Sequence, residues 1–170
     1  MTHQLIIIGA GPGGYEVGVK AAKAGLQVLV VEARKLGGTC LNEGCIPTKC
    51  LCKNASLLQE LKEANAFGIE AGEVQFDLSK AIARKDGIVE KLASGIATLM
   101  KTPGITLVQG KAQFIDQHTI EVEGTQYSAP NIIIATGSVT KFLPIEGAHG
   151  EGVVTSTEML NLTQVPQRLC

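Results

Sequence analysis

Apolar residues fall first into a short strand, then a helix, then a second strand. Residues 4–8 and 27–31 are brief, nearly continuous aliphatic runs, which predict buried β-strands. Between them, residues 12–24 are rich in alanine, valine and lysine and are followed by Gly25, which predicts a helix ended by a glycine. Together these segments predict a βαβ unit of about thirty residues with parallel strands and a right-handed crossover.

Two longer stretches then have helical character. Residues 45–66 have helical composition once past Pro47. Residues 77–100 predict a second long helix that ends at Pro103-Gly104, because apolar side chains recur at helical spacing. The apolar positions of this second helix are Leu78, Ile82, Ile88, Leu92, Ile96 and Leu99.

Short alternating runs replace the helical pattern in the last third of the chain. They predict a β-meander that forms a small antiparallel layer, with runs at 105–109, 111–115, 119–122 and 125–128. Residues 131–135 predict another buried strand, which ends in "ATGS". Beyond Lys141 the chain is loop-like, with a short helical turn expected near 156–160. The fold class predicted is therefore α/β, a parallel sheet with flanking helices plus an antiparallel meander.

The composition is that of an ordinary globular protein. Apolar residues make up 45% and charged residues 18% of the 170 residues, which excludes a disordered chain. One domain of this size buries about 70% of the surface that its unfolded chain exposes. The formal net charge of −1 gives no basic surface, so no nucleic-acid partner is expected.

The chain lacks the features of a membrane or secreted protein. No apolar run is long enough to span a membrane, and the start "MTHQLIIIGAG" has neither a charged n-region nor a cleavage-like site. We therefore expect a cytoplasmic protein with no membrane contact. In that reducing compartment, clustered cysteines are more often catalytic or metal-binding than structural.

A glycine-rich turn follows the first strand. Gly9, Gly11 and Gly14 have the spacing G-x-G-x-x-G, which in a dinucleotide site permits a tight turn, a close approach of backbone to a pyrophosphate, and close packing of helix on strand. The helix N-terminus adds N–H donors and the positive end of a dipole. Glu32 closes the second strand, where an acidic residue is expected to hold a ribose hydroxyl. The alternative is an ordinary βαβ turn with a solvated glutamate, and we favour dinucleotide binding.

Four cysteines gather at Cys40, Cys45, Cys50 and Cys52, and three kinds of site could explain them. Their spacing does not match structural zinc sites or plant-type iron–sulfur sites, and no histidine is near, so no metal is expected. A structural disulfide between Cys40 and Cys45 would need the loop at 41–44 to bring their Cα atoms within about 7 Å. A loop so short would restrict the unfolded chain only modestly.

The third kind of site is a redox-active dithiol. Cys45 lies just before Pro47, which favours the first turn of a helix, and a helix N-terminus stabilises a thiolate. Lys49 lies one helical turn beyond Cys45 and adds a positive charge. A dithiol next to a dinucleotide site suggests that two electrons pass between the thiols and a bound cofactor.

Residues 37–49, "GGTCLNEGCIPTK", resemble the redox-active signature of the flavin-dependent pyridine nucleotide–disulfide oxidoreductases. The segment "LNEGCIPTK" is most similar to the version found in dihydrolipoyl dehydrogenases. "IIIGAGPGGYEVGVKAAKAG" and "NIIIATGS" are also similar to that family, in the same order and at similar spacing. The resemblance covers essentially the whole chain and implies a Rossmann-like, three-layer FAD-binding domain.

The resemblance also implies roles by position. Cys45 is implied to be the thiol adjacent to the flavin, Cys40 the outer thiol that exchanges with the substrate disulfide, and Lys49 a neighbour of the flavin N5. The implied cofactor contacts besides Lys49 are Gly9, Gly11, Pro12, Gly13, Gly14, Glu32, Gly38, Thr39, Lys111, Ala112, Ala135, Thr136 and Gly137.

The implied activity belongs to a longer protein. Family members also have an NAD-binding domain and a dimerisation domain, so residues 1–170 are expected to be an N-terminal portion that binds FAD weakly and turns over negligibly. The whole enzyme would oxidise protein-bound dihydrolipoyl groups, passing electrons through Cys40 and Cys45 to FAD and then NAD+. The implied partners are a second copy of the chain and a lipoyl-bearing subunit of a 2-oxo-acid dehydrogenase complex or glycine cleavage system.

Alternatives remain open at this point. A relative acting on glutathione or mercury has the same signature, and a non-catalytic nucleotide-binding module has no need of thiol chemistry. Cys50 and Cys52 lie outside the signature and are expected to be buried helix residues that pack as small hydrophobes. The other interpretation is disulfide exchange with Cys45, for which Cys52 is the stronger candidate because residues 45, 49 and 52 share a helical face.

Overall fold

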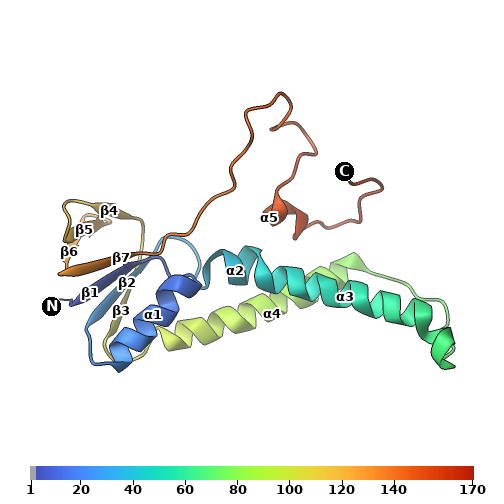
Figure 1. Ribbon diagram of the computed structural model, residues 1–170, viewed down its shortest axis with the longest axis horizontal. Coiled ribbons are helices and arrows are strands. Elements are labelled where there is room, and N and C mark those ends of the chain that lie inside the picture. The colour runs from blue at the N-terminus through green and yellow to red at the C-terminus, as the bar shows by residue number, and fades with distance from the viewer. Residues whose placement is uncertain (1–2) are drawn as a thin grey trace. The chain divides into compact units, whose positions relative to one another are not determined.

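A computed structural model describes residues 3–170, which form two compact units. The first unit contains the chain up to Asn42 and Lys91–Val139, and the second contains Glu43–Glu90 and Thr140–Cys170. Figure 1 shows the sheets of the first unit and the long helices. Each unit is described by itself.

The first unit is built on a parallel sheet with the strand order β3-β2-β1-β7. Strand β1 (Leu5–Ile8) lies between β2 (Val28–Glu32) and β7 (Asn131–Ile134), and β3 (Ile105–Gln109) forms one edge. Helix α1 (Pro12–Lys23) connects β1 to β2. Because all pairs are parallel, the carboxyl ends of these strands meet at one edge of the sheet.

A second, antiparallel sheet covers one face of the parallel sheet. It consists of β4 (Ala112–Phe114), β5 (Thr119–Val122) and β6 (Thr125–Ser128). Both sheets contribute to one apolar cluster, whose buried members are Ile6, Ile8, Leu29, Val31, Ile120, Val122 and Ala129.

Helix α1 packs on the opposite face of the parallel sheet. A Cβ atom added at Gly18 would lie 3.3 Å from Val30 Cγ2 and 3.5 Å from Ile7 Cδ1, so the helix axis comes close to the strands. Helix, parallel sheet and antiparallel sheet form three layers. This arrangement confirms the expected Rossmann-like α/β fold with an antiparallel meander.

One part of the predicted meander is wrong. Residues 105–109 belong to the parallel sheet, where β3 pairs with β2 in the register Val28↔Ile105, and only three strands form the antiparallel layer. At the edge of the sheet no residue of β3 is fully buried: Ile105 and Val108 are half-buried, and the three others are exposed. A parallel neighbour needs a long crossover connection, and the helices between β2 and β3 provide one.

Short helix α2 (Gly38–Glu43) is a further difference from the prediction. Cys40 lies in this helix, whereas the sequence predicted a loop at 41–44. Asn42 braces the helix, because its Nδ2 atom donates to the carbonyl oxygens of Leu36 at 3.0 Å and Gly38 at 2.9 Å.

The second unit is mainly helical. It contains α3 (Cys45–Glu63), the 3-10 helix η1 (Ala64–Phe67), the first part of α4 (Leu78–Leu99) and the short helix α5 (Ser156–Met159). Both long helices match the predicted ones closely. No helix within residues 3–170 combines the length and apolar character needed to cross a membrane.

A buried lysine holds the C-terminal segment of this unit to α4. The Lys85 ammonium donates to Asn161 Oδ1 at 2.6 Å and to the Leu160 carbonyl at 3.2 Å, and it pairs with Asp86 at 2.8 Å. Its side chain is only 3% exposed, so these oxygens offset the cost of burying the charge.

Candidate functional site

The glycine turn after β1 is shaped by backbone contacts that leave no room for a side chain at Gly9. This residue has φ +105°, and an added Cβ would lie 2.3 Å from the Ala135 carbonyl oxygen. The Gly9 N–H donates to the Val31 carbonyl at 2.7 Å, and the Ala135 N–H donates to the Ile8 carbonyl at 2.8 Å. The turn therefore lies at the carboxyl edge of the sheet, against the chain that leaves β7.

Gly14 and Gly38 bring other backbone segments close to this turn. A Cβ at Gly14 would lie 1.8 Å from the Gly9 carbonyl oxygen, and a Cβ at Gly38 would lie 2.8 Å from Gly11 Cα. By contrast, a Cβ at Gly13 would meet no atom within 4 Å. The first turn of α1 is thus packed on its strand and on α2 while its backbone at Gly13 faces open space.

The N-terminus of α1 has the character of an anion-binding end. Gly11 is the N-cap, Pro12 begins the helix, and no side chain among the described residues caps it. The N–H groups and positive dipole end of such a helix favour a phosphate group.

Glu32 is a buried carboxylate held in one orientation at the end of β2. Its Oε2 accepts from the Ala10 N–H at 2.7 Å, and its Oε1 accepts from the Arg34 N–H at 2.8 Å. The side chain is 8% exposed. Because each carboxylate oxygen has a second lone pair, Glu32 can still accept a hydrogen bond from a ligand hydroxyl beside the glycine turn.

The remaining predicted contacts of the first unit lie at the same edge of the sheet. The Gly110 N–H donates to the Glu32 carbonyl at 2.9 Å, which brings the start of β4 next to the end of β2. Thr136 N would lie 3.2 Å from a Cβ at Gly9. The residues that the structure gathers around this edge are Gly9, Gly11, Pro12, Gly13, Gly14, Glu32, Gly38, Lys111, Ala112, Ala135 and Thr136.

Cys40 lies two residues into α2, next to the glycine turn. The Gly37 N–H donates to the Ala10 carbonyl at 2.8 Å and ties the start of this helix to the turn. The Cys40 side chain is half-buried, and that of Thr39 is exposed. The structure therefore places Cys40, the outer cysteine of the predicted pair, on the unit that carries the glycine turn.

Cys45 is the first residue of α3 and belongs to the second unit. It is an exposed, free thiol, and Gly44 precedes it as the N-cap. Pro47 is fully buried in the first turn, and the Thr48 N–H donates to the Gly44 carbonyl at 3.0 Å. Lys49 lies four residues along the same helix and is exposed. The predicted placement of Cys45 at a helix N-terminus is confirmed.

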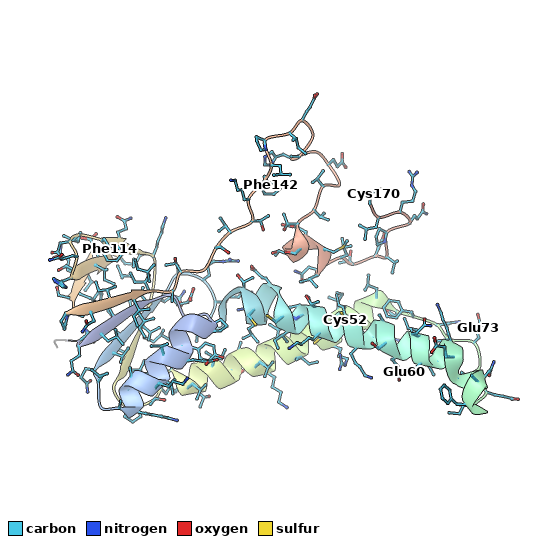
Figure 2. The ribbon with its side chains drawn as sticks, viewed as in Figure 1. Cys52, Glu60, Glu73, Phe114, Phe142 and Cys170 are labelled. Atoms are coloured by element: carbon cyan, nitrogen blue, oxygen red, sulfur yellow. The ribbon has the colours of Figure 1, made fainter. Side chains whose placement is uncertain are left out.

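The two additional cysteines differ from each other. Cys50 is buried, as predicted, whereas Cys52 is exposed on α3, and the prediction of burial is wrong for this residue (Figure 2). Cys52 lies seven residues beyond Cys45 in an unbroken helix, a rise of about 10.5 Å. This separation exceeds the Cα distance of about 7 Å that a disulfide can bridge, so the geometry of α3 opposes a direct exchange between them.

Metal binding finds no support among the described residues. Within residues 3–170, no three histidine, cysteine, aspartate or glutamate side chains come together in a way that could hold a metal ion.

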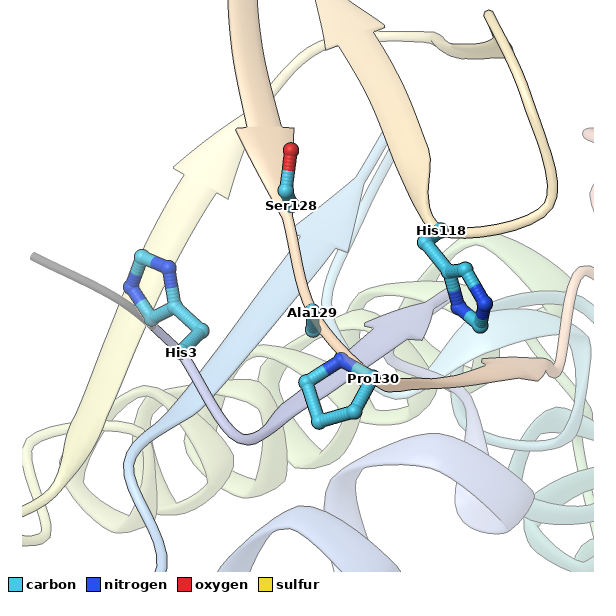
Figure 3. Close-up of a pocket in the computed structure, with 5 residues that line it drawn as sticks. All are labelled: His3, His118, Ser128, Ala129 and Pro130. Carbon is cyan, nitrogen blue, oxygen red and sulfur yellow. The ribbon is translucent and has the colours of Figure 1, made fainter.

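A shallow pocket of about 210 Å³ lies elsewhere, before the starts of β1 and β7 (Figure 3). It is lined by His3, His118, Ser128, Ala129 and Pro130, and the two histidines lie on either side of the segment that ends at Pro130. Burial lowers the pKa of His3, whose Nδ1 atom has no hydrogen-bond partner among the described residues. The sequence indicated no role for these histidines, and the pocket is remote from the carboxyl edge of the sheet.

Comparison with known proteins gives a consistent result. The family model described as "Pyridine nucleotide-disulphide oxidoreductase" matches residues 3–170. Dihydrolipoyl dehydrogenase of Acholeplasma laidlawii is 42% identical over 98% of the chain, which spans 51% of that protein. Dihydrolipoyl dehydrogenase of Thermus scotoductus is 45% identical over 99% of the chain, which spans 36% of that protein. The chain therefore spans about half or less of the length of these relatives.

Solved structures include similar folds. The HOCl-induced flavoprotein disulfide reductase RclA from Escherichia coli superposes with a TM-score of 0.81 at 34% identity. The match covers 96% of this chain and 35% of that one.

Proposed function

Because the chain belongs to the pyridine nucleotide–disulphide oxidoreductase family, we propose that it supplies the FAD-binding portion and the redox-active cysteines of a dihydrolipoyl dehydrogenase. The whole enzyme oxidises protein-bound dihydrolipoyl groups and transfers the electrons to NAD+. In this proposal the NAD-binding and dimerisation functions lie outside residues 1–170. Sequence identities of 42% and 45% to two dihydrolipoyl dehydrogenases support this choice of substrate.

The shape of the glycine turn is the observation that carries the proposal. The turn fits a diphosphate because its backbone is open at Gly13, while Gly9 and Gly14 are held by contacts that exclude a side chain. The uncapped N-terminus of α1 offers N–H donors there, and the oriented Glu32 carboxylate offers acceptors for ribose hydroxyls one strand away. We therefore assign the ADP half of FAD to this edge of the sheet.

The other assigned contacts follow the same edge. Gly38 and Thr39 would line the diphosphate and ribityl region, the backbone at Lys111-Ala112 would meet the adenine, and Lys49 would lie near the flavin ring. The strand-end contact is assigned to Ala135, Thr136 and Gly137. Bound FAD would supply a two-electron acceptor next to Cys45.

The thiol chemistry is assigned to Cys40 and Cys45 as a disulfide in the resting enzyme. One substrate thiolate attacks Cys40 Sγ, the Cys40–Cys45 bond breaks, and Cys45 leaves as a thiolate. The second substrate thiolate then attacks the substrate sulfur of this mixed disulfide and releases Cys40. The substrate loses two electrons and becomes a cyclic disulfide, and the cysteine pair gains both electrons.

The proposed surroundings of the enzyme follow from the same assignment. We propose a cytoplasmic homodimer that acts on a lipoyl-bearing subunit of a 2-oxo-acid dehydrogenase complex or glycine cleavage system. A second candidate function is disulfide reduction, in which electrons flow from a nicotinamide nucleotide to a disulfide substrate. The structural similarity to the flavoprotein disulfide reductase RclA supports this second candidate function.

Replacement of Glu32 tests the dinucleotide assignment. Glu32→Gln keeps one acceptor for the backbone but removes the charge and one oxygen, so we expect about tenfold weaker FAD binding, since hydrogen bonds to charged groups contribute about 1.5–3 kcal/mol. Saturable changes in flavin fluorescence measure the affinity of the 170-residue chain. Glu121→Gln, on β5, is the matched control and should bind FAD like the unaltered chain. Absence of FAD binding by the unaltered chain, or equal affinity of folded Glu32→Gln, would refute the assignment.

A further inference from the structure

Helix α1, which carries Tyr15, and helix α2, which carries Cys40, are in backbone contact at their N-terminal ends. A Cβ at Gly38 would lie 2.8 Å from Gly11 Cα, and the Gly37 N–H donates to the Ala10 carbonyl at 2.8 Å. The backbones of α1 and α2 therefore meet at their first residues, and glycine at both positions allows this approach (Figure 1).

Tyr15 and Cys40 lie within the first turns that leave this contact. The Tyr15 N–H donates to the Gly11 carbonyl at 2.9 Å, which fixes Tyr15 in the first turn of α1. Cys40 lies two residues after Gly38, in a turn that the Asn42 amide braces. Both side chains are half-buried. Tyr15 lies four residues after Gly11 and therefore on the same face of α1, the face on which Gly11 meets Gly38 of α2.

The phenol of Tyr15 is a hydrogen-bond donor in this environment. Burial raises the pKa of Tyr15 above its ordinary value, and the negative charges of Glu16 and Cys40 raise it further, together with a hydrogen bond to Glu16. Glu16 on α1 and Cys40 on α2 are the ionisable groups that act on the phenol. The hydroxyl consequently keeps its proton at neutral pH, and a negative charge on Cys40 acts on it through space.

We propose that the Tyr15 hydroxyl donates a hydrogen bond to the Cys40 thiolate and holds this sulfur in position for thiol–disulfide exchange. Glu16 accepts the same proton while Cys40 is in a disulfide or protonated, and the hydroxyl turns to the sulfur when the thiolate forms. Tyr15 is therefore a positioning residue that stabilises the outer thiolate. The inference rests on the proposed role of Cys40 as the exchanging thiol.

Alkylation of Cys40 tests the proposal in the reduced 170-residue chain. The rate of reaction with iodoacetamide is measured against pH, and mass spectrometry assigns the label to each cysteine. Tyr15→Phe should move the midpoint of the Cys40 profile about one pH unit higher, which lowers the thiolate fraction about tenfold below both midpoints. The rate at neutral pH should fall only about threefold, since a more basic thiolate is also more nucleophilic.

Two further variants keep the test decisive. Tyr127→Phe, on β6, removes a hydroxyl elsewhere in the same unit and should leave the Cys40 profile unchanged. Glu16→Gln removes the competing acceptor and should move the Cys40 midpoint lower. A downward shift that persists in high salt, which screens the effect of the lost charge, decides the matter if circular dichroism shows that Tyr15→Phe does not fold.

An unchanged Cys40 profile in folded Tyr15→Phe would overturn the proposal. So would an equal shift in Tyr127→Phe, a shift confined to Cys45, or a Glu16→Gln midpoint that stays or rises. Alkylation needs no flavin, so the proposed function is judged separately. A chain that binds no FAD but shows the Tyr15→Phe shift would refute the dinucleotide assignment and leave the hydrogen bond standing.

Discussion

At the start of α1, two adjacent glycines have opposite surroundings. A Cβ at Gly14 would lie 1.8 Å from the Gly9 carbonyl oxygen, while a Cβ at Gly13 would meet no atom within 4 Å. We expect Gly14→Ala to lower the free energy of unfolding by about 3 kcal/mol, because the backbone of the turn must move to admit the methyl group. Gly13→Ala should be neutral or stabilising by about 0.5 kcal/mol. Urea unfolding of both variants measures this, and equal losses would contradict the close packing of α1 on the turn.

The sequence predicted the placement of residues that are close together in the chain or at the ends of adjacent strands. The spacing of Gly9, Gly11 and Gly14 follows from the contacts between a strand, its turn and the next helix. Glu32 was predicted at the end of the adjacent strand, and its placement there is confirmed. The contact of Gly38 with Gly11 could not be foreseen, since it joins segments 27 residues apart that no local pattern relates.

The first turn of α4 depends on the Asp77 carboxylate. Asp77 Oδ1 accepts from the N–H groups of Ser79 at 2.9 Å and Lys80 at 3.2 Å. A hydrogen bond from the Ser79 side chain is the main cause that lowers the pKa of Asp77, and the Lys80 N–H adds to it. The folded state therefore favours the charged carboxylate, so its stabilisation is present above the ordinary carboxyl value of about 3.9 and is lost as the pH falls through the lowered value.

Asp77→Ala should accordingly lower the thermal midpoint of the chain at neutral pH. The difference from the unaltered chain should shrink as the pH falls through the lowered pKa of Asp77, where the carboxyl becomes protonated. Asp77→Asn retains a capping oxygen without the charge and serves as the control, with a smaller effect at neutral pH. Calorimetry across this pH range measures the difference, and a gap that does not change with pH would contradict the capping role.

At the scale of elements, local sequence patterns predicted the long helices but not which sheet each strand joins. The helix at 77–100 was found because its apolar positions recur at helical spacing, and the helix at 45–66 was found from its helical composition. Strand β3 was assigned to the wrong sheet, because its mixed apolar and polar residues predict a strand but not the direction of the strand beside it. Helix α2 escaped prediction because it has six residues, begins at a glycine with φ +56°, and is held by the Asn42 side chain.

At the scale of the whole molecule, the chemistry divides between two units. The glycine turn, Glu32 and Cys40 lie in the first unit, while Cys45 and Lys49 lie at the start of α3 in the second. The sequence located both cysteines through one short motif. The assembly in which a flavin, a dithiol and a nicotinamide nucleotide cooperate remains a proposal for the whole enzyme, since the chain spans 51% and 36% of the two dihydrolipoyl dehydrogenases compared.

The function proposed above requires Cys45 to act beside a flavin bound at the glycine turn. The visible absorbance spectrum of the 170-residue chain, saturated with FAD and reduced with limiting dithionite, tests it most directly. We predict a long-wavelength charge-transfer band that is present in the unaltered chain, retained in Cys40→Ser and lost in Cys45→Ser. A spectrum without this band in the unaltered chain, or a band that persists in Cys45→Ser, would contradict the account.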